Sequence, residues 1–450
     1  MLTIPTEVET LLKSRSMLGE NRPQWNVVLT SSCSSFGVPD VSEIVIEKQM
    51  YQAQVCQLTM DNKDGVYSPD RTGAWSNLFW PNSEIKVELG YGSTYANAQA
   101  FLGLIDSVQM RRLPHVGSVM NVTCRDYYKR ALDQMVQDDL GTLAVTFSDQ
   151  PLEDIFIDLA ERAGWSTGDI TAEPTCMVVA EKTFARESYA DAFLWLSEVA
   201  GFEVVVPETG TIEYRFATDR QPEAVAEPIT LTSTAWTNLA HNYVVSGSML
   251  LRSSSAGGGD LYSTDSDYDI EYGDPARVAR LAGSSIGDGS TCFGTYVYAA
   301  WTFTEGVDIF ELGYTIDDDD MYADVVVEGE SETGEPIYVS RDTYLNPYWN
   351  LHDHKTMYVR LVDADSSDKC DEVASRLATR SAQRARRCEF ATVGNPWLQV
   401  GDCIQIVEHI TTVSEIYRIT GIEHRFDKDG FVTQLQTHYY GYTAPPSGAV

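Results

Sequence analysis

Basic residues are scarce in this 450-residue chain. It contains 32 Lys and Arg against 66 Asp and Glu, which gives a formal net charge of −34. A surface with so few cations repels phosphate backbones and anionic lipid headgroups. The composition therefore argues against specific nucleic-acid binding and against binding to a membrane surface.

Long apolar runs and a leader segment are also missing. No apolar stretch approaches the roughly 18 residues from which a spanning helix is predicted. The first residues, MLTIPTEVETLLKSRS, show no basic region followed by an apolar one. The sequence therefore predicts neither a signal peptide nor a membrane anchor.

The eight cysteines form no recognisable framework. No two of them make a Cys-x-x-Cys pair, and none stands at zinc-finger spacing from a pair of histidines. A chain of this length has enough core without cross-links. We therefore predict reduced, mostly buried thiols in a protein made in a reducing cytoplasm. The cysteines stand at positions 33, 56, 124, 176, 292, 370, 388 and 403.

Catalytic motifs are absent from the sequence as well. It has no HExxH, no GxSxG, no Walker loop and no GxGxxG after a strand. His352 and His354 would share one face of a strand and supply half of a metal site, but no third ligand is evident. The acidic run Asp317–Asp320 is interpreted as a solvated loop, with a cation held between subunits as the alternative. We predict no enzymatic activity, no cofactor and no resident metal.

Two segments resemble calcium loops but have the wrong spacing. In Asp61–Gly65 the first ligand position would fall on Met60, and in Asp427–Gly430 it would fall on Arg425. Asp and Gly both tolerate the positive φ of tight turns. Both segments are therefore predicted to be hairpin turns.

Apolar residues alternate with period two from Trp25 onward. Six short segments rich in β-branched residues are bounded by Gly, Pro, Asn or Asp, which is typical of an antiparallel barrel or sandwich. A long aromatic loop, 61–82, interrupts them, and its length suggests contact with another molecule. The six segments are WNVVLT, VSEIVIEK, AQVCQLTM, SEIKVELGY, AFLGLIDSVQM and SVMNVTCRDYY.

Helical periodicity replaces this alternation further along the chain. Residues 151–165 and 188–202 each repeat apolar residues at helical spacing and close with Gly, and a predicted hairpin follows the second helix. A second β-rich region contains a Ser/Gly/Asp-rich insertion, and the last residues are again β. The fold class predicted is mainly β with a small α+β part.

A third helix is predicted over 366–388, and it carries the most prominent basic feature of the chain. Four arginines line one of its faces: Arg376, Arg380, Arg384 and Arg387. One interpretation is a face that pairs with the chain's own carboxylates. The other is a subunit interface, because Arg is favoured there.

Three parts of the sequence together resemble the tail hub proteins of bacteriophages and related contractile injection systems. The first is LTMDNKDGVYSPDR, followed by NSEIKVELGYG and AFLGLIDSV. The second is the pair of helix endings LAERAGW and LSEVAGF. The third is NPWLQVGDCIQIV followed by IYRITGIEHRFDKDGFVTQLQTH. The order and spacing of these motifs, over most of residues 25–440, carry the resemblance.

The resemblance implies an architecture of two antiparallel, tube-like β-barrels with inserted helical and accessory domains. The expected divisions are an N-terminal arm at 1–22, a first hub barrel at 23–135, a helical α+β domain at 136–230, a second barrel at 231–440 and a flexible tail at 441–450. The acidic insertion near 251–322 departs from the family. The chain also shows no lysozyme-like or peptidase extension of the kind some hubs carry, which counts against a cell-wall-degrading role.

The function implied is structural. A homotrimer would form a pseudo-sixfold ring at the distal end of the tail, adapt the sixfold tube to a threefold tip, and line the channel for DNA without binding it specifically. Expected partners are the tail tube or distal tail protein, the tape measure protein and a tip, spike or fibre protein. The chain would be assembled in the host cytoplasm and reside in the virion, at the tail tip or baseplate.

Two alternatives remain open from the residues alone. Abundant Tyr, Trp and carboxylates also suit a carbohydrate-binding or glycan-hydrolysing β-protein, which would need two carboxylates across a cleft. An adhesin that binds protein partners through loop 61–82 is the other alternative.

Overall fold

The structure is a computed structural model that describes most of residues 23–440. The expected arm 1–22 and tail 441–450 lie outside the described residues, as do His352, His354 and Asp317–Asp320. Within 23–440 the residues left undescribed are 32–33, 51, 69–74, 76–77, 93–97, 114–116, 176, 201, 217–222, 242–243, 245–247, 256–259, 265, 272–275, 317–321, 332–334, 343–354, 362–365, 385 and 409–413.

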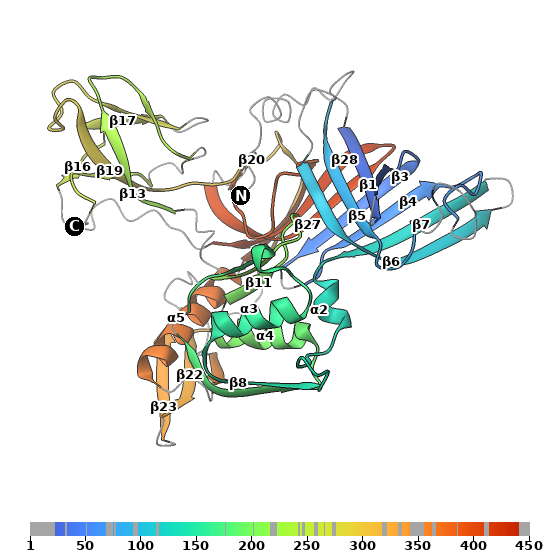
Figure 1. The fold of residues 1–450 in the computed structure, drawn as a ribbon. Coiled ribbons are helices and arrows are strands. Elements are labelled where there is room, and N and C mark those ends of the chain that lie inside the picture. Colours follow the sequence, from blue (N-terminus) through green and yellow to red (C-terminus); the bar gives the residue numbers. More distant parts are fainter. Residues whose placement is uncertain are drawn as a thin grey trace.

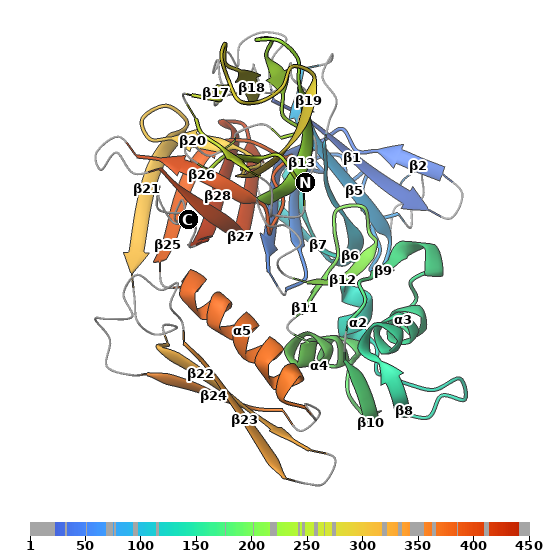
Figure 2. The same ribbon diagram turned by 90° about the vertical axis from the view of Figure 1, so that its left-hand side faces the viewer.

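One thirteen-stranded sheet dominates the molecule (Figures 1 and 2). Its path runs through β2 (Ser34–Gly37), β1 (Pro23–Ser31), β5 (Glu84–Tyr91), β6 (Ala98–Leu113), β7 (Gly117–Asp126), β4 (Val55–Asp61), β3 (Val41–Gln49), β27 (Ser414–Asp427), β28 (Gly430–Tyr439), β25 (Arg386–Val393) and β21 (Ile309–Ile316). Off this path, β26 (Cys403–Val407) pairs with β27 and with β20 (Thr302–Thr304).

Strand β27 joins the two β-rich regions. Its first half pairs with β26, and its second half pairs with β3 over residues 421–426. A bulge between Ile419 and Gly421 separates the two halves. The mainly antiparallel β fold with a small α+β part is confirmed, but closure of two separate barrels is not found among the described strands. Both regions belong to one sheet, because β3 and β27 exchange backbone hydrogen bonds.

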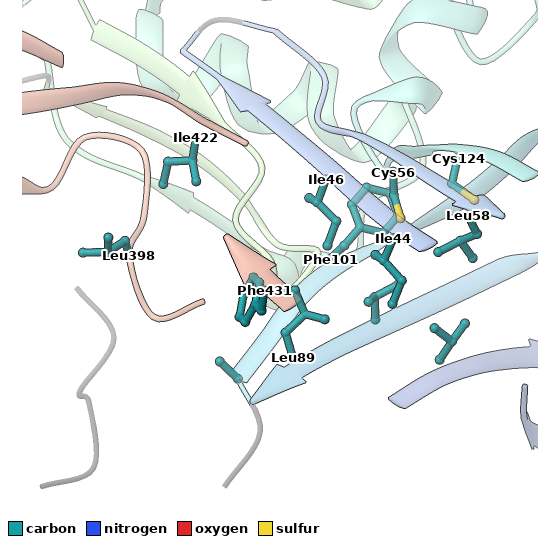
Figure 3. Packing of buried hydrophobic residues seen from close by; sticks show 14 of the residues in the cluster. Ile44, Ile46, Cys56, Leu58, Leu89, Phe101, Cys124, Leu398, Ile422 and Phe431 are labelled. Atoms are coloured by element: carbon teal, nitrogen blue, oxygen red, sulfur yellow. The ribbon is translucent and has the colours of Figure 1, made fainter. Parts of the chain in front are cut away.

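The main core follows the period-two alternation along these strands. In β3, Ile44 and Ile46 are fully buried, while Glu47 and Gln49 point to the other face and are exposed. The cluster continues from the first region into the second without a break, as Figure 3 shows around Phe431. Apolar burial on this scale is the main term that holds the two regions together.

A helical unit lies beside the sheet (Figure 1). Buried apolar residues at helical spacing, such as Phe156 and Phe193, confirm the predicted pair of helices, and Gly164 ends the first one with φ +102°. Its elements are α2 (Lys129–Asp133), β8 (Ala144–Pro151), α3 (Leu152–Arg162), a 3₁₀ turn η2 (Thr167–Asp169), β9 (Ile170–Ala172), β10 (Val178–Ala185), α4 (Tyr189–Ala200), β11 (Phe202–Val205) and β12 (Ile212–Phe216).

The third helix, α5 (Ser367–Arg384), covers one face of a three-stranded sheet of β22 (Asp324–Glu330), β23 (Pro336–Asp342) and β24 (Thr356–Arg360) (Figure 2). Val325 and Val327 of β22 share a core with Val373 of α5. The prediction of a helix as far as residue 388 was wrong at its end. Strand β25 begins at Arg386, because pairing with both β28 and β21 prevails over the local helical period.

A small β lobe projects away from the main sheet (Figures 1 and 2). It has its own core, which includes Leu251, Val278 and Tyr296. Its strands are β13 (Glu223–Leu231), β14 (Thr237–Asn238), β15 (Leu250–Arg252), β16 (Leu261–Tyr262), β17 (Tyr268–Glu271), β18 (Arg277–Arg280) and β19 (Ser290–Val297). In the ranges that the structure describes, no helix is both long and apolar enough to cross a bilayer.

Candidate functional site

The face of the main sheet where the two β regions meet is acidic. It carries one glutamate from each of four strands: Glu47 of β3, Glu423 of β27, Glu389 of β25 and Glu311 of β21. These residues line a hollow of ≈ 340 Å³. We refer to this surface as the acidic face.

Strand register sets the four glutamates in two adjacent rows. The first row across the sheet reads Glu47, Glu423, Gln434, Ala391, Glu311, and the second reads Gln49, Gly421, Gln436, Glu389, Gly313. Neither row contains a basic side chain. The acidic face is therefore a band of carboxylates, amides and small residues that presents no cation to an approaching molecule.

Glu47 and Glu423 face each other directly across the β3–β27 ladder. The Met50 amide donates to the Thr420 carbonyl, so these two residues are a hydrogen-bonded pair. Hydrogen-bonded and non-hydrogen-bonded pairs alternate along an antiparallel ladder. Glu47 and Glu423 lie three positions from Met50 and Thr420, so they form a non-hydrogen-bonded pair. Side chains approach most closely in such pairs, and like charges placed opposite each other destabilise a sheet. The register therefore places two like charges directly opposite each other at the centre of the acidic face.

The nearest cation along β27 is already neutralised. The Arg425 guanidinium lies 2.9 Å from the Glu43 carboxylate and 3.3 Å from that of Asp427. Arg387 lies one row beyond the second row, opposite His438 and Thr315. The basic residues thus flank the acidic face and do not lie within it.

A buried ion pair lies on the opposite side of β3. Lys48 pairs with Glu208, and the two side chains are only 2% and 7% exposed. The Gln399 amide donates to the same carboxylate at 2.8 Å. Burial by itself raises the pKa of Glu208, but attraction to the Lys48 ammonium and the hydrogen bonds it receives bring that pKa below its ordinary value. Glu208 is therefore a charged group that ties the helical unit to both β regions.

A second buried ion pair joins the same two parts. Arg418 of β27 donates to both carboxylate oxygens of Glu203 of β11, at 3.1 and 3.2 Å. Both hydrogen bonds come from one nitrogen, Nη2, and charge-assisted hydrogen bonds of this kind are stronger than neutral ones. The helical unit is thus held to the sheet through two carboxylates, Glu203 and Glu208, and the sheet supplies both cations.

Asp126 is the buried carboxylate of this junction that makes no salt bridge within the described residues. It accepts hydrogen bonds from the backbone amides of Gln54 and Tyr128, each at 3.0 Å. Burial raises its pKa from 3.8 to about 7.

The arginines predicted to form one stripe belong to two elements. Arg376, Arg380 and Arg384 lie on α5, whereas Arg387 lies on β25. Their role as a subunit interface stays a prediction. No group of three or more His, Cys, Asp or Glu that could hold a metal occurs in the described part of the chain.

The residues of the acidic face were missed from sequence. Each strand contributes only one or two glutamates at outward positions, as in VSEIVIEK and TGIEHRF, which is what any solvent-facing strand shows. The signal lies in the pairing of β3 with β27, and no local pattern reveals that pairing.

No protein-family model matches the chain, and no curated protein matches it in sequence. Solved structures similar in fold include two phage-type tail proteins. One is the 43 kDa tail protein of prophage MuSo2 from Shewanella oneidensis, with a TM-score of 0.56 and 10% identity over 93% of this chain and 99% of that one. The other is a tail protein from Neisseria meningitidis MC58, with a TM-score of 0.56 and 10% identity over 94% and 99%. The resemblance drawn from sequence is thus confirmed at the level of the fold.

Proposed function

We propose that this chain is a structural hub at the distal end of a phage tail, where three copies form a ring and the acidic face lines the channel for DNA. The single observation that carries the proposal is the acidic face on a fold similar to that of phage tail proteins. Each copy contributes four carboxylates and no cation from its two central rows.

Electrostatics gives the acidic face its role. Duplex DNA carries one negative charge per ~1.7 Å, so a basic lining would hold it tightly and in a salt-dependent way. A wall of carboxylates repels the phosphates and leaves the duplex free to slide. The amide and glycine positions between the glutamates offer no cation that would slow its passage.

The rest of the proposal follows the expectations from sequence. The ring adapts a sixfold tail tube to a threefold tip, and its partners are the tube or distal tail protein, the tape measure protein and a tip, spike or fibre protein. The chain acts in the virion after assembly in the host cytoplasm, and its role is structural and not catalytic.

The first test is assembly and shape. Light scattering should give a mass of three chains, and electron microscopy should show a ring with a central channel. A monomer at all concentrations, or an assembly without a channel, contradicts the proposal. Binding of the monomer to glycans would favour the carbohydrate-binding alternative instead.

The second test concerns the lining. The double variant Glu47→Lys/Glu423→Lys should retain duplex DNA in a salt-dependent manner, whereas the unaltered ring should not. The matched control is Glu181→Lys/Glu198→Lys, which makes the same charge change at exposed positions of the helical unit. Equal DNA retention by both variants would mean that the acidic face does not line the channel.

A further inference from the structure

Eight strands of the main sheet form an unbroken antiparallel series between two uncovered edges. They run in the order β6, β7, β4, β3, β27, β28, β25 and β21. Every neighbouring pair in this series is antiparallel. An uncovered edge displays unpaired backbone N–H and C=O groups, which is a template for pairing with another chain.

The first uncovered edge is the distal half of β6. Strand β5 pairs with β6 only over Ala98–Leu104, whereas β7 follows β6 as far as Leu113. Residues 107–113 therefore have a strand on one side and none on the other among the described strands. Figure 1 shows this half of β6 extending with β7 beyond β5.

The second uncovered edge is β21. It pairs with β25 along Ile309–Ile316. Apart from an isolated bridge between Glu305 and Ile309, no described strand pairs with its other side. Figure 2 shows β21 at the margin of the sheet. The two uncovered edges have nearly equal lengths.

The even number of strands decides how two such edges can meet. With eight antiparallel strands in series, β6 and β21 run in opposite directions. When β21 of one copy lies beside β6 of the next, the two strands are antiparallel. The alternation of strand direction then continues from one copy into the next. Side-chain alternation then keeps Glu311 and Gly313 on the same face as Gln109 and Arg111.

Charge fixes the register of this contact. Arg111 and Glu311 are both exposed, and among the described residues neither forms an ion pair within its own chain. A register that sets Arg111 opposite Glu311 also sets Gln109 opposite Gly313. Opposite charges that face each other across a ladder stabilise the pairing, and like charges oppose it.

We infer that the seam between copies is an antiparallel pairing of β21 with residues 107–113 of β6 in a second copy, with Glu311 opposite Arg111. This inference rests on the proposed ring and names the surface that closes it. The seam removes both uncovered edges and makes the sheets of neighbouring copies continuous, with the charge of Arg111 offset by Glu311 on the face that carries the four glutamates.

A charge swap tests the seam. Arg111→Glu and Glu311→Arg each place like charges opposite each other, and each should raise the concentration at half-assembly about tenfold. The double variant Arg111→Glu/Glu311→Arg should return this concentration to within about threefold of the unaltered chain.

Arg112→Glu is the matched control for the charge swap. It makes the same charge change on the same strand, but its side chain faces the other side of the sheet, so Glu311→Arg should not rescue it. Both residues are exposed, so the melting temperature of the monomer should not move.

Cross-linking provides an independent readout. Cysteines at Gln109→Cys and Gly313→Cys should form intermolecular disulfides under a mild disulfide oxidant and give covalent oligomers up to three chains. A ring of normal mass that shows neither rescue nor this cross-link overturns the seam and leaves the proposed function standing. A chain that stays monomeric under all conditions overturns both.

Discussion

Lys48 of β3 and Glu208, in the turn after β11, form an ion pair inside the molecule, on the side of β3 that faces away from Glu47 and Gln49. Attraction between buried charges offsets the cost of removing both from water only while both are present. The pair therefore contributes less to net stability than to a single fixed arrangement of the helical unit on the sheet.

Removal of one partner should be costly. In Glu208→Ala the Lys48 ammonium is left buried without its counter-ion, and we expect a loss of about 3–5 kcal/mol in the free energy of unfolding. Urea denaturation followed by circular dichroism measures this loss. The control is Lys63→Ala, which breaks the exposed pair with Asp61 and should change stability little. Equal effects of the two variants would mean that the Lys48–Glu208 pair is solvated.

Asp126 should make stability depend on pH near neutrality. Its folded pKa of about 7 lies above its ordinary value, so the folded state holds a proton that the unfolded state releases. The stability that this proton contributes is complete below about pH 4 and is lost as the pH rises through about 7. In Asp126→Asn this pH slope should be smaller than in the unaltered chain. The free energy of unfolding of both chains should be measured from pH 4.5 to 8, a range that spans most of the interval between the ordinary and the raised pKa of Asp126. Identical pH slopes for Asp126→Asn and the unaltered chain would contradict a buried Asp126 that makes no salt bridge.

Cys56 and Cys124 should stay reduced although they lie directly opposite each other in β4 and β7. The backbone amide of Asp126 donates to the Gln54 carbonyl, so these two residues are a hydrogen-bonded pair. Cys56 lies two residues after Gln54 and Cys124 two residues before Asp126, so the cysteines also form a hydrogen-bonded pair. Their Cβ atoms are then about 5.5 Å apart, whereas a disulfide needs about 3.5–4.5 Å. Burial also raises the pKa of both thiols, which keeps the reactive thiolate scarce.

Incubation of the folded chain with oxidised glutathione, followed by unfolding and maleimide labelling, should find both thiols intact. The same treatment of the urea-unfolded chain is the control, because there the thiols are accessible and ionise normally. A native mass lower by two hydrogens, with the bond mapped to these two residues, would contradict the register.

Local features of the fold were predictable, and long-range ones were not. Helices α3 and α4 were found because Phe156, Phe193 and their neighbours repeat at helical spacing and Gly164 ends the first run. The strands around Ile44 were found because period-two alternation is a property of each strand alone. The pairing of β3 with β27 joins segments from opposite ends of the chain, and nothing in either segment specifies the other.

The same limit explains the errors at the sites. Arg387 continues the helical spacing of Arg376, Arg380 and Arg384, yet it belongs to β25, because the flanking strands β21 and β28 determine its conformation. Glu47 and Glu423 each look like an ordinary solvent-facing residue. Only the register turns them into a facing pair of like charges, and with Glu389 and Glu311 into an acidic surface.

That pair of like charges predicts a conflict between stability and function. Glu423→Gln keeps the size of the side chain and one acceptor oxygen but removes the charge that repels Glu47, so the free energy of unfolding should rise by about 0.2–1 kcal/mol. The gain should shrink as salt is added, because both carboxylates are at the surface and their repulsion is screened. Glu198→Gln, an exposed site on α4, is the control and should change stability little. If Glu423→Gln is neutral or destabilising at low salt, the two carboxylates turn away from each other, and the argument that their charge is kept for the channel loses its basis.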